Sequence, residues 1–232
     1  YEVQFLPGLD AMNFNRTVWI ANGPNSSFEF KVANKYAAAM RIDNTSIKGL
    51  RIGFSGYIGS SIDNTYTRNS NGTASHLNGT VSIGSIDFSF NRYNWIVRGQ
   101  ATYGHLSDAY NIYYLDGRQS KTSPYSSDLV GKNAIATGIE TGYDIFSQIE
   151  KLRADNQKFY IFGRYEYYNS YIRDKRQAPY DYTAKNIVDC GFNWYPIPQI
   201  VIKCDYQKRF LKKQYNDEPS LNIGIAYEGF FL

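Results

Sequence analysis

The stretch "PSLNIGIAYEGFFL", Pro219–Leu232, alternates bulky apolar residues with small or polar ones. Successive side chains of a β-strand point to opposite faces, so this alternation predicts a strand over residues 220–231 with one apolar face. The apolar positions are Leu221, Ile223, Ile225, Tyr227 and Phe231. One further residue, Leu232, follows the last aromatic side chain.

The same alternation recurs along most of the chain, and no segment carries a helical stripe of comparable length. We predict strands at 1–6, 13–22, 28–43, 50–62, 80–91, 94–107, 134–148, 158–172, 185–195, 199–211 and 220–231. Strands of soluble sheets usually have about 5–6 residues, and tilted membrane-spanning strands need about 9–11. The length of the predicted strands therefore favours an all-β fold, an antiparallel up-and-down transmembrane β-barrel.

The connections alternate in length. Short turns are predicted at 44–49, 92–93 and 196–198, and long polar loops at 63–79, 108–133, 173–184 and 212–219. Outer-membrane barrels sort their connections in this way, with the long loops on the extracellular side. The charged connection at 149–157 is longer than its place among the short turns requires. We predict one barrel domain over 1–232.

The strand count suggests that part of the barrel precedes this chain. We predict about eleven strands, whereas bacterial single-chain outer-membrane barrels have an even number. The sequence opens with "YEVQF" at Tyr1, which resembles the middle of a strand. We therefore expect strands upstream of Tyr1 and roughly 12–16 strands in the complete barrel.

The alternation divides each strand into an apolar and a polar face. A soluble barrel would show the same alternation with the apolar face inside, but the bulky aromatic residues of the apolar face favour the lipid-facing arrangement. Pore-lining candidates on the polar face are Arg41, Arg51, Asp87, Arg98, Glu140, Asp144, Arg164, Glu166, Lys203, Asp205, Arg209 and Glu228, with Asp43 and Asp189 beside them. These mixed charges fit either an internal ion-pair network or, with the arginines on one wall, a path for anions.

Two hairpins allow the pairing to be predicted. With 92–93 as the turn, Phe90 faces Trp95 and Asp87 faces Arg98. With the turn centred on Ile197, the cysteines are opposite each other on the apolar face; they are Cys190 and Cys204. Two small lipid-facing residues and a cross-strand disulfide are both compatible with that placement. Near the same short turns, Trp95 and Trp194 are candidates for an interfacial aromatic belt.

Composition excludes several classes of protein. The net charge of +4 is dispersed rather than gathered in a basic run, so nucleic-acid binding is not expected. Two Cys and two His offer little for a metal site, and we expect neither metal nor cofactor. No run of 18 apolar residues is present, which excludes a transmembrane helix.

An alternative from another functional class is an enzyme built on the barrel wall. His105 and Ser107 share one strand face, but their spacing places them about 6–7 Å apart along the strand, too far for direct contact. The second histidine, His76, lies in a predicted loop. We therefore expect no enzymatic activity.

Several segments together resemble the phosphate-selective porin-like outer-membrane proteins of Gram-negative bacteria, over about residues 1–231. They are "NFNRTVWIANGPNSS" (13–27), "AAAMRIDNTSIKGLRIGFSGYIGSS" (37–61), "NAIATGIETGYDIFS" (133–147), "FGRYEYYNSY" (162–171), "WYPIPQIVIKCDY" (194–206) and "PSLNIGIAYEGFF" (219–231). The resemblance implies a closed barrel in the bacterial outer membrane, commonly a homotrimer, through which small solutes diffuse. It also implies that the insertion machinery reads the final aromatic, Phe231, with Tyr227 before it. Leu232 is then surplus, and we expect it to be a remnant of an expression vector.

The expected function is a porin-type channel for small hydrophilic solutes, with phosphate-like anions as the finer expectation. In the family, phosphate selectivity comes from basic residues that line the pore. The alternative is a non-conducting barrel whose Tyr-rich loops, 108–133 and 173–184, bind a partner at the cell surface.

Overall fold

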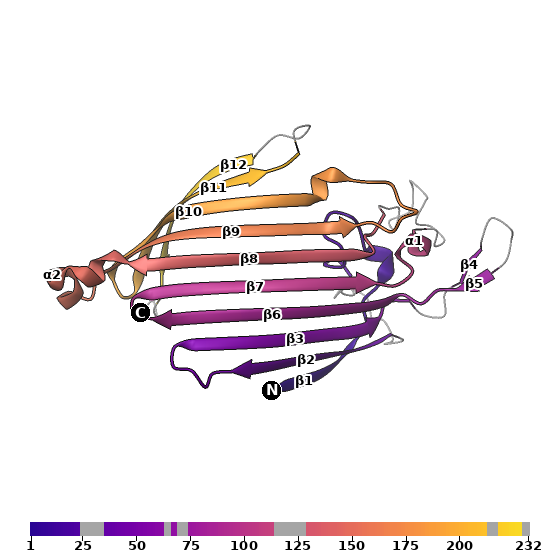
Figure 1. Ribbon diagram of the computed structural model, residues 1–232, viewed down its shortest axis with the longest axis horizontal. Coiled ribbons are helices and arrows are strands. Elements are labelled where there is room, and N and C mark those ends of the chain that lie inside the picture. Colours follow the sequence, from indigo (N-terminus) through magenta and orange to yellow (C-terminus); the bar gives the residue numbers. More distant parts are fainter. Residues whose placement is uncertain (24–34, 63–65, 69–73, 114–128, 213–217, 229–232) are drawn as a thin grey trace.

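The computed structural model describes residues 1–23, 35–62, 66–68, 74–113, 129–212 and 218–228. One antiparallel sheet dominates it, and each strand pairs with its neighbours along the chain (Figure 1). In sheet order the strands are β1 (Glu2–Pro7), β2 (Tyr36–Asn44), β3 (Leu50–Ser60), β6 (Thr80–Arg92), β7 (Trp95–Leu106), β8 (Asn133–Asp144), β9 (Lys158–Ile172), β10 (Ala184–Ile197), β11 (Ile200–Phe210) and β12 (Glu218–Tyr227). The prediction of an all-β, antiparallel, up-and-down fold is confirmed.

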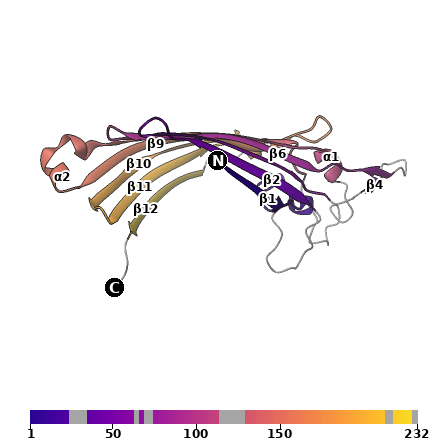
Figure 2. The same cartoon turned by 90° about the horizontal axis from the view of Figure 1, so that it is seen from below.

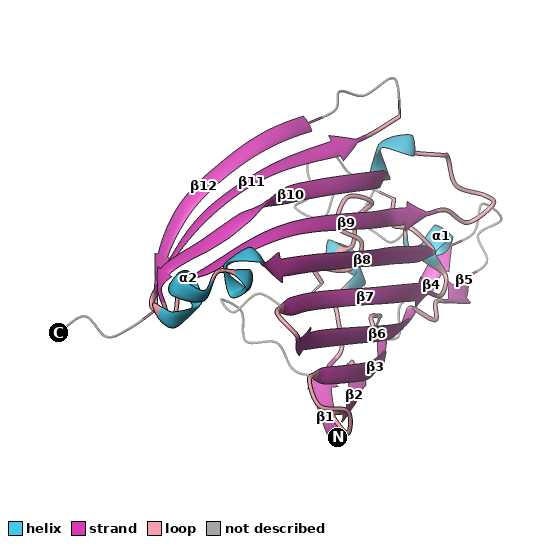
Figure 3. Cartoon of the chain, turned by 60° about the vertical axis from the view of Figure 1, so that its left-hand side comes forward, coloured by secondary structure: helices cyan, strands magenta, loops and turns pink. Residues whose placement is uncertain are grey.

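The remaining elements are short. β4 (Tyr66–Arg68) and β5 (Ala74–His76) form a hairpin beyond the end of the sheet. In the described residues the two α-helices are α1 (Ala109–Ile112) and α2 (Glu150–Ala154), and the 3₁₀ turns are η1 (Ala11–Asn13), η2 (Ile145–Gln148) and η3 (Asp181–Thr183). Figure 3 shows that α2 projects from the end of the sheet that carries the short connections. None of the helices in the described part is long and apolar enough to cross a membrane.

The sheet curves into an open trough (Figure 2). In the described residues β1 and β12 are its two edges, and neither pairs with a further strand. Large apolar side chains cover the convex face: Ile58 on β3, Ile139 on β8 and Ile223 on β12 are 57%, 50% and 74% exposed. Residues of opposite parity occupy the concave face, where most of the charged side chains of the strands lie. The predicted division into apolar and polar faces is thus present toward the middle of the sheet.

One predicted strand is wrong. Residues 13–22 form no part of the sheet but belong to the connection from β1 to β2, which includes η1. Local polar contacts replace sheet pairing there, because the Asn15 side chain accepts hydrogen bonds from the backbone amides of Thr17 and Val18. The backbone then turns through Trp19, whose φ is 55°. The alternation of residues 13–22 therefore does not indicate a strand.

The predicted pairing of β6 with β7 is also wrong. Tyr93 and Asn94 form the two-residue turn, with φ of 55° and 66°, and Arg92 pairs with Trp95. Positive φ at both central residues is typical of the type I′ hairpin turn, which Asn tolerates well. The register consequently shifts by two residues relative to the prediction. Phe90 faces Val97, Asp87 faces Gln100, and Arg98 faces Ser89.

The two cysteines are not opposite each other. A register shift between Trp194 and Ile197, in the segment that contains Pro196, moves Cys190 opposite Tyr206 and Cys204 opposite Phe192. Both thiols are free, and Cys190 is exposed on the convex face. The interpretation as two small residues on the apolar face therefore stands, and the cross-strand disulfide does not.

Phe231 and Leu232 lie outside the described residues, as do 24–34, 63–65, 69–73, 114–128 and 213–217. The predictions for the assembly signal at Phe231 and for the origin of Leu232 therefore stay predictions. Tyr227 is the last residue of β12 and pairs with Ile200. Only parts of the predicted loops 63–79, 108–133 and 212–219 are described.

Candidate functional site

The connection after β1 folds onto the concave face at the long-loop end of the sheet. We call residues 8–23 the inner loop. Its Ala11 amide donates to the Ser61 carbonyl over 3.0 Å, and its Arg16 carbonyl accepts from the Ser170 hydroxyl over 2.7 Å. The inner loop therefore reaches from the end of β3 to β9, across the concave face of the strands between them.

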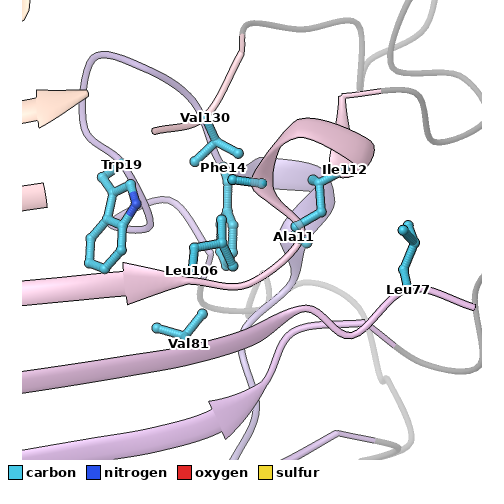
Figure 4. Packing of buried hydrophobic residues seen from close by; sticks show 9 residues of the cluster. Ala11, Phe14, Trp19, Leu77, Val81, Leu106, Ile112 and Val130 are labelled. Atoms are coloured by element: carbon cyan, nitrogen blue, oxygen red, sulfur yellow. The ribbon is translucent and has the colours of Figure 1, made fainter. Parts of the chain in front are cut away.

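A small apolar core holds the inner loop in place (Figure 4). Phe14 is 1% exposed and packs in one cluster with Val81 of β6 and Leu106 of β7, both fully buried. The other buried members are Ala11, Trp19, Leu77, Ala109, Ile112 and Val130. This core lies inside the trough, where the predicted barrel would contain water. It narrows the long-loop end of the concave face.

Trp19 of the inner loop packs directly against the wall of the trough. Its indole Nε1 donates to the Gly131 carbonyl over 2.9 Å. Its ring occupies the place of a side chain at Gly104, where a Cβ would come 2.0 Å from the Trp19 Cη2 atom. The absence of a side chain at Gly104 therefore makes room for the indole ring. No pattern in the sequence predicts this contact between Trp19 and Gly104.

Farther along the same face, charged residues form a band across the strands. Cross-strand pairing connects Arg51, Ser89, Arg98, Glu140, Arg164 and Asp189 in succession. We call the charged residues of this row and the adjoining positions the charged belt. Its members are Arg41, Asp43, Arg51, Asp87, Arg98, Glu140, Arg164, Glu166 and Asp189. Seven of them are among the predicted pore-lining candidates, and Asp43 and Asp189 were assigned to the same face.

One end of the charged belt is a closed ring of ion pairs. Asp87 accepts from Arg41 over 3.0 Å and from Arg51 over 2.7 Å. Asp43 bridges the same two guanidinium groups over 2.8 and 2.7 Å. Gly53 leaves room for this ring, because a Cβ there would lie 2.4 Å from Arg41 Nη2. Each of the four charges has two opposite neighbours, so the ring is electrically balanced.

The other end of the belt is a tight pair. Arg164 Nη2 donates to Asp189 Oδ2 over 2.6 Å, and Arg164 Nε lies 3.4 Å from Glu166. The Asp189 side chain is only 3% exposed, which strengthens its interaction with the guanidinium group. The positive charge of Arg164 is therefore compensated by the carboxylates of Asp189 and Glu166.

Between these two groups the wall is hollowed into a depression of about 690 Å³. Arg98 of β7 and Glu140 of β8 border it, with Gln100, Ala136 and Gly138. The Arg98 side chain is 64% exposed, and its Nη1 atom lies 3.9 Å from the nearest oxygen of Glu140. This is the longest ion pair of the belt, and it leaves both groups accessible to a solute.

The other pore-lining candidates do not join the belt. Asp144 is 6% exposed, and its carboxylate accepts hydrogen bonds from the backbone amides of Phe146 and Phe159. Its role is to cap the turn after β8, so we remove it from the lining. Lys203 is exposed on β11. Asp205 accepts from Asn222, Arg209 pairs with Glu218, and the Glu228 amide donates to the Gln199 carbonyl.

The aromatic candidates lie on the convex face near the short turns. Trp95 packs against Tyr143 with ring centroids 4.8 Å apart. Trp194 is opposite Phe159, which stacks on Phe192 at 5.1 Å. These side chains belong to four neighbouring strands, β7 to β10, and lie near the short turns, where an interfacial belt is expected.

The histidine and serine of the enzyme alternative do not meet. The Nδ1 atom of His105 lies 2.7 Å from the amide oxygen of Asn133. The Ser107 hydroxyl accepts from the Thr80 amide over 2.7 Å. Among the described residues there is no cluster of His, Cys, Asp or Glu that would hold a metal ion.

The loop after β9 closes over the inner loop. Arg16 lies 4.2 Å from the ring of Tyr180 and 5.7 Å from that of Tyr182. The guanidinium group of Arg176 similarly lies 4.3 Å from the ring of Tyr110. Three of the tyrosines that the surface-partner alternative would use, Tyr110, Tyr180 and Tyr182, thus pack on arginines of the same chain.

The same loop carries a perturbed carboxyl group. Gln177 is buried and donates to the Val130 carbonyl over 2.9 Å, which fixes the loop to the apolar core. Hydrogen bonds from the side chain and backbone of Arg176 lower the pKa of the Asp174 carboxyl below its ordinary value. Lys132, 3.7 Å away, acts in the same direction.

Comparisons with known proteins add little to this geometry. No protein-family model matches the sequence, and no curated protein matches it. The chain is similar in structure to OmpTdeltaL8 (loop L8 deletion mutant of OmpT), an outer membrane protein of Vibrio cholerae, with 10% sequence identity and a TM-score of 0.45. The match covers 85% of this chain and 60% of that chain. A likeness of this extent identifies no activity and no family.

Proposed function

We propose that this sheet is the wall of an outer-membrane porin-type channel through which small hydrophilic solutes diffuse. The observation that carries the proposal is the opposite character of the two faces. The convex face exposes large apolar side chains across the sheet, and the concave face carries the charged belt and its depression. If the convex face contacts lipid and the concave face contacts water, both apolar and charged side chains are in favourable surroundings.

The open edges bear on the same proposal. Unpaired backbone groups are costly in the hydrocarbon region of a bilayer, so a membrane-spanning sheet must close on itself. We propose that strands additional to the ten described here complete the barrel, within the range of 12–16 expected from the sequence. Whether three barrels assemble into a trimer follows from the resemblance alone and stays a prediction.

The charged belt does not favour phosphate. Its five carboxylates, Asp43, Asp87, Glu140, Glu166 and Asp189, outnumber the four guanidinium groups of Arg41, Arg51, Arg98 and Arg164. Three of the arginines are held by carboxylates within 3.0 Å. We therefore propose passage without strong preference for anions, and we do not retain phosphate as the preferred solute.

Conductance of the complete protein in planar bilayers tests the proposal. We expect stable single-channel steps, and reversal potentials in a salt gradient that stay near zero. Reversal potentials that show strong anion preference would restore the phosphate expectation. Correct insertion is monitored by the slower gel migration of the heat-unfolded protein, so that an absence of steps can be interpreted.

A second candidate function is a non-conducting barrel that presents its long loops to a surface partner. The inner loop favours it, because Phe14 and Trp19 fill the long-loop end of the trough with a packed core. A correctly inserted barrel without conductance would support this candidate and contradict the channel.

A further inference from the structure

Arg98 and Glu140 form the most widely spaced ion pair of the charged belt, and Arg98 is its most exposed member. The ion pairs of Arg41, Arg51 and Asp189 have contacts of 2.6–3.0 Å, and Arg164 lies 3.4 Å from Glu166, whereas Arg98 and Glu140 are separated by 3.9 Å. Their side chains are 64% and 30% exposed, compared with 3% for Asp189. A pair of this kind contributes little to stability. Its two charges are instead available to a molecule that enters the depression.

The surroundings of the pair leave space for such a molecule. Gln100 follows Arg98 on the same face of β7, and Ala136 and Gly138 precede Glu140 on the same face of β8. The two small residues line the depression without bulky side chains, and Gln100 adds an amide donor and acceptor. The depression thus combines a cation, an anion and a neutral hydrogen-bonding group with two small lining residues.

We propose that Arg98 and Glu140 form a subsite for zwitterionic solutes that carry a carboxylate and an ammonium group on neighbouring atoms, as free amino acids do. The guanidinium group binds the solute carboxylate, for which its planar fork is well suited. Glu140 accepts hydrogen bonds from the solute ammonium group. The 3.9 Å between the two protein groups matches a solute whose own opposite charges are close together.

Other solute classes fit the subsite less well. A simple anion on Arg98 would face the carboxylates of Glu140 and Glu166, 30% and 38% exposed, and would gain nothing from them. A neutral sugar would form hydrogen bonds but would bring no opposite charge to either group. The inference rests on the proposed channel function and deepens it by naming a solute class.

Liposome swelling with three solutes of similar size tests the subsite. L-serine is the zwitterion, erythritol the neutral control, and sodium lactate the carboxylate without an ammonium group. The complete protein is compared with the variants R98Q, R98K and E140Q. The same exchange at the exposed helix α2, R153Q, is the matched control for loss of one arginine away from the depression. Swelling in erythritol reports the number of open channels and hence correct folding.

We expect R98Q and E140Q each to lower the ratio of the serine rate to the erythritol rate by about two- to fivefold, the size expected for one exposed charge contact. R98K should lose less, because it retains the charge, and R153Q should match the natural protein. Lactate separates the alternatives, because E140Q should speed its passage while slowing that of serine. Unchanged serine ratios in both variants, or parallel changes for serine and lactate in E140Q, would overturn the subsite and leave the channel intact. Vesicles that swell in none of the three solutes would contradict the channel itself.

Discussion

The concave face has two regions that the same strands build in opposite ways. At the long-loop end, Val81 of β6 and Leu106 of β7 are fully buried beneath the inner loop. Toward the middle, Asp87 and Arg98 of the same two strands belong to the charged belt, and Arg98 is 64% exposed. The face on which a strand residue lies therefore does not decide whether it meets water; the segment that covers it does.

This difference separates two tasks. The packed region determines how far the long-loop end is narrowed, because its apolar core fixes the inner loop to the wall. The charged belt determines which solutes are attracted or repelled, because its groups are accessible. Variants in one region should therefore change the size limit of the channel, and variants in the other should change its selectivity.

The largest effect is expected from Phe14→Ala. Truncation of a fully buried phenylalanine typically costs about 3–5 kcal/mol, here lost from the packing of the inner loop. The loop should leave the wall, so its amides should exchange faster in hydrogen-exchange mass spectrometry and the single-channel conductance should rise. Val18→Ala is the control, because Val18 lies in the same loop and is 40% exposed. Equal exchange and conductance in the two variants would show that the core does not hold the loop.

Gly104→Ala should act on the same loop from the wall side. The new Cβ would lie 2.0 Å from the Trp19 ring, so the indole must move, at a cost of about 1–3 kcal/mol. The tryptophan emission should shift to longer wavelength as Trp19 is exposed. At Gly163 a Cβ meets nothing within 4 Å, so Gly163→Ala should leave the spectrum unchanged. A blue-shifted or unaltered spectrum for Gly104→Ala would contradict the packing of the Trp19 ring against Gly104.

Asp87→Asn tests the charged belt. Arg41 and Arg51 lose one of their two carboxylates, so the reversal potential should move toward anion preference. Because the ring is partly exposed, we expect the free energy of unfolding to fall by only about 1–2 kcal/mol. Urea unfolding in lipid vesicles measures the second quantity, with the exposed Asp155→Asn after α2 as the control. A shift toward cations would be incompatible with the ring as described.

The smallest effect concerns pH and the loop that covers the packed region. The pKa of Asp174 is lowered in the folded loop, so its contribution to loop stability is present above the pKa of an unfolded Asp and is lost as pH falls through the folded value. Amides of residues 173–177 should therefore exchange faster, after correction for intrinsic rates, as pH falls below about 4. Asp174→Asn should remove this dependence, and its persistence in the variant would assign it to another group.

Period-two alternation was sufficient to predict the antiparallel fold and the face of most charged residues. Parity alone decides whether Arg41, Arg98 or Arg164 faces the concave side, and parity is independent of register. The pairs within the belt depend on register, and register depends on turn geometry. Because Tyr93 and Asn94 adopt left-handed backbone conformations in the turn, Asp87 is not paired with Arg98. The register shift near Pro196 likewise separates the two cysteines.

The inner loop was the larger failure of the sequence-based prediction. The residues around Phe14 and Trp19 alternate as a strand does, but their apolar side chains pack on the trough instead of facing lipid. The capping role of Asp144 was hidden for a similar reason, because hydrogen bonds to backbone amides at a turn leave no periodic signal. Long-range packing and turn chemistry therefore account for what the alternation could not predict.

The central claim is that the convex face meets lipid and the concave face meets water, and the two native cysteines allow a direct measurement. In lipid vesicles the protein is treated with a membrane-impermeant maleimide, and a variant with Ser89→Cys in place of both native cysteines is treated alongside. We predict that Cys190 and Cys204, on the convex face, stay unmodified until the protein is unfolded, and that Ser89→Cys on the concave face reacts in the folded state. Modification of Cys190 in folded, inserted protein as fast as the residue 89 thiol would contradict the assignment of the two faces.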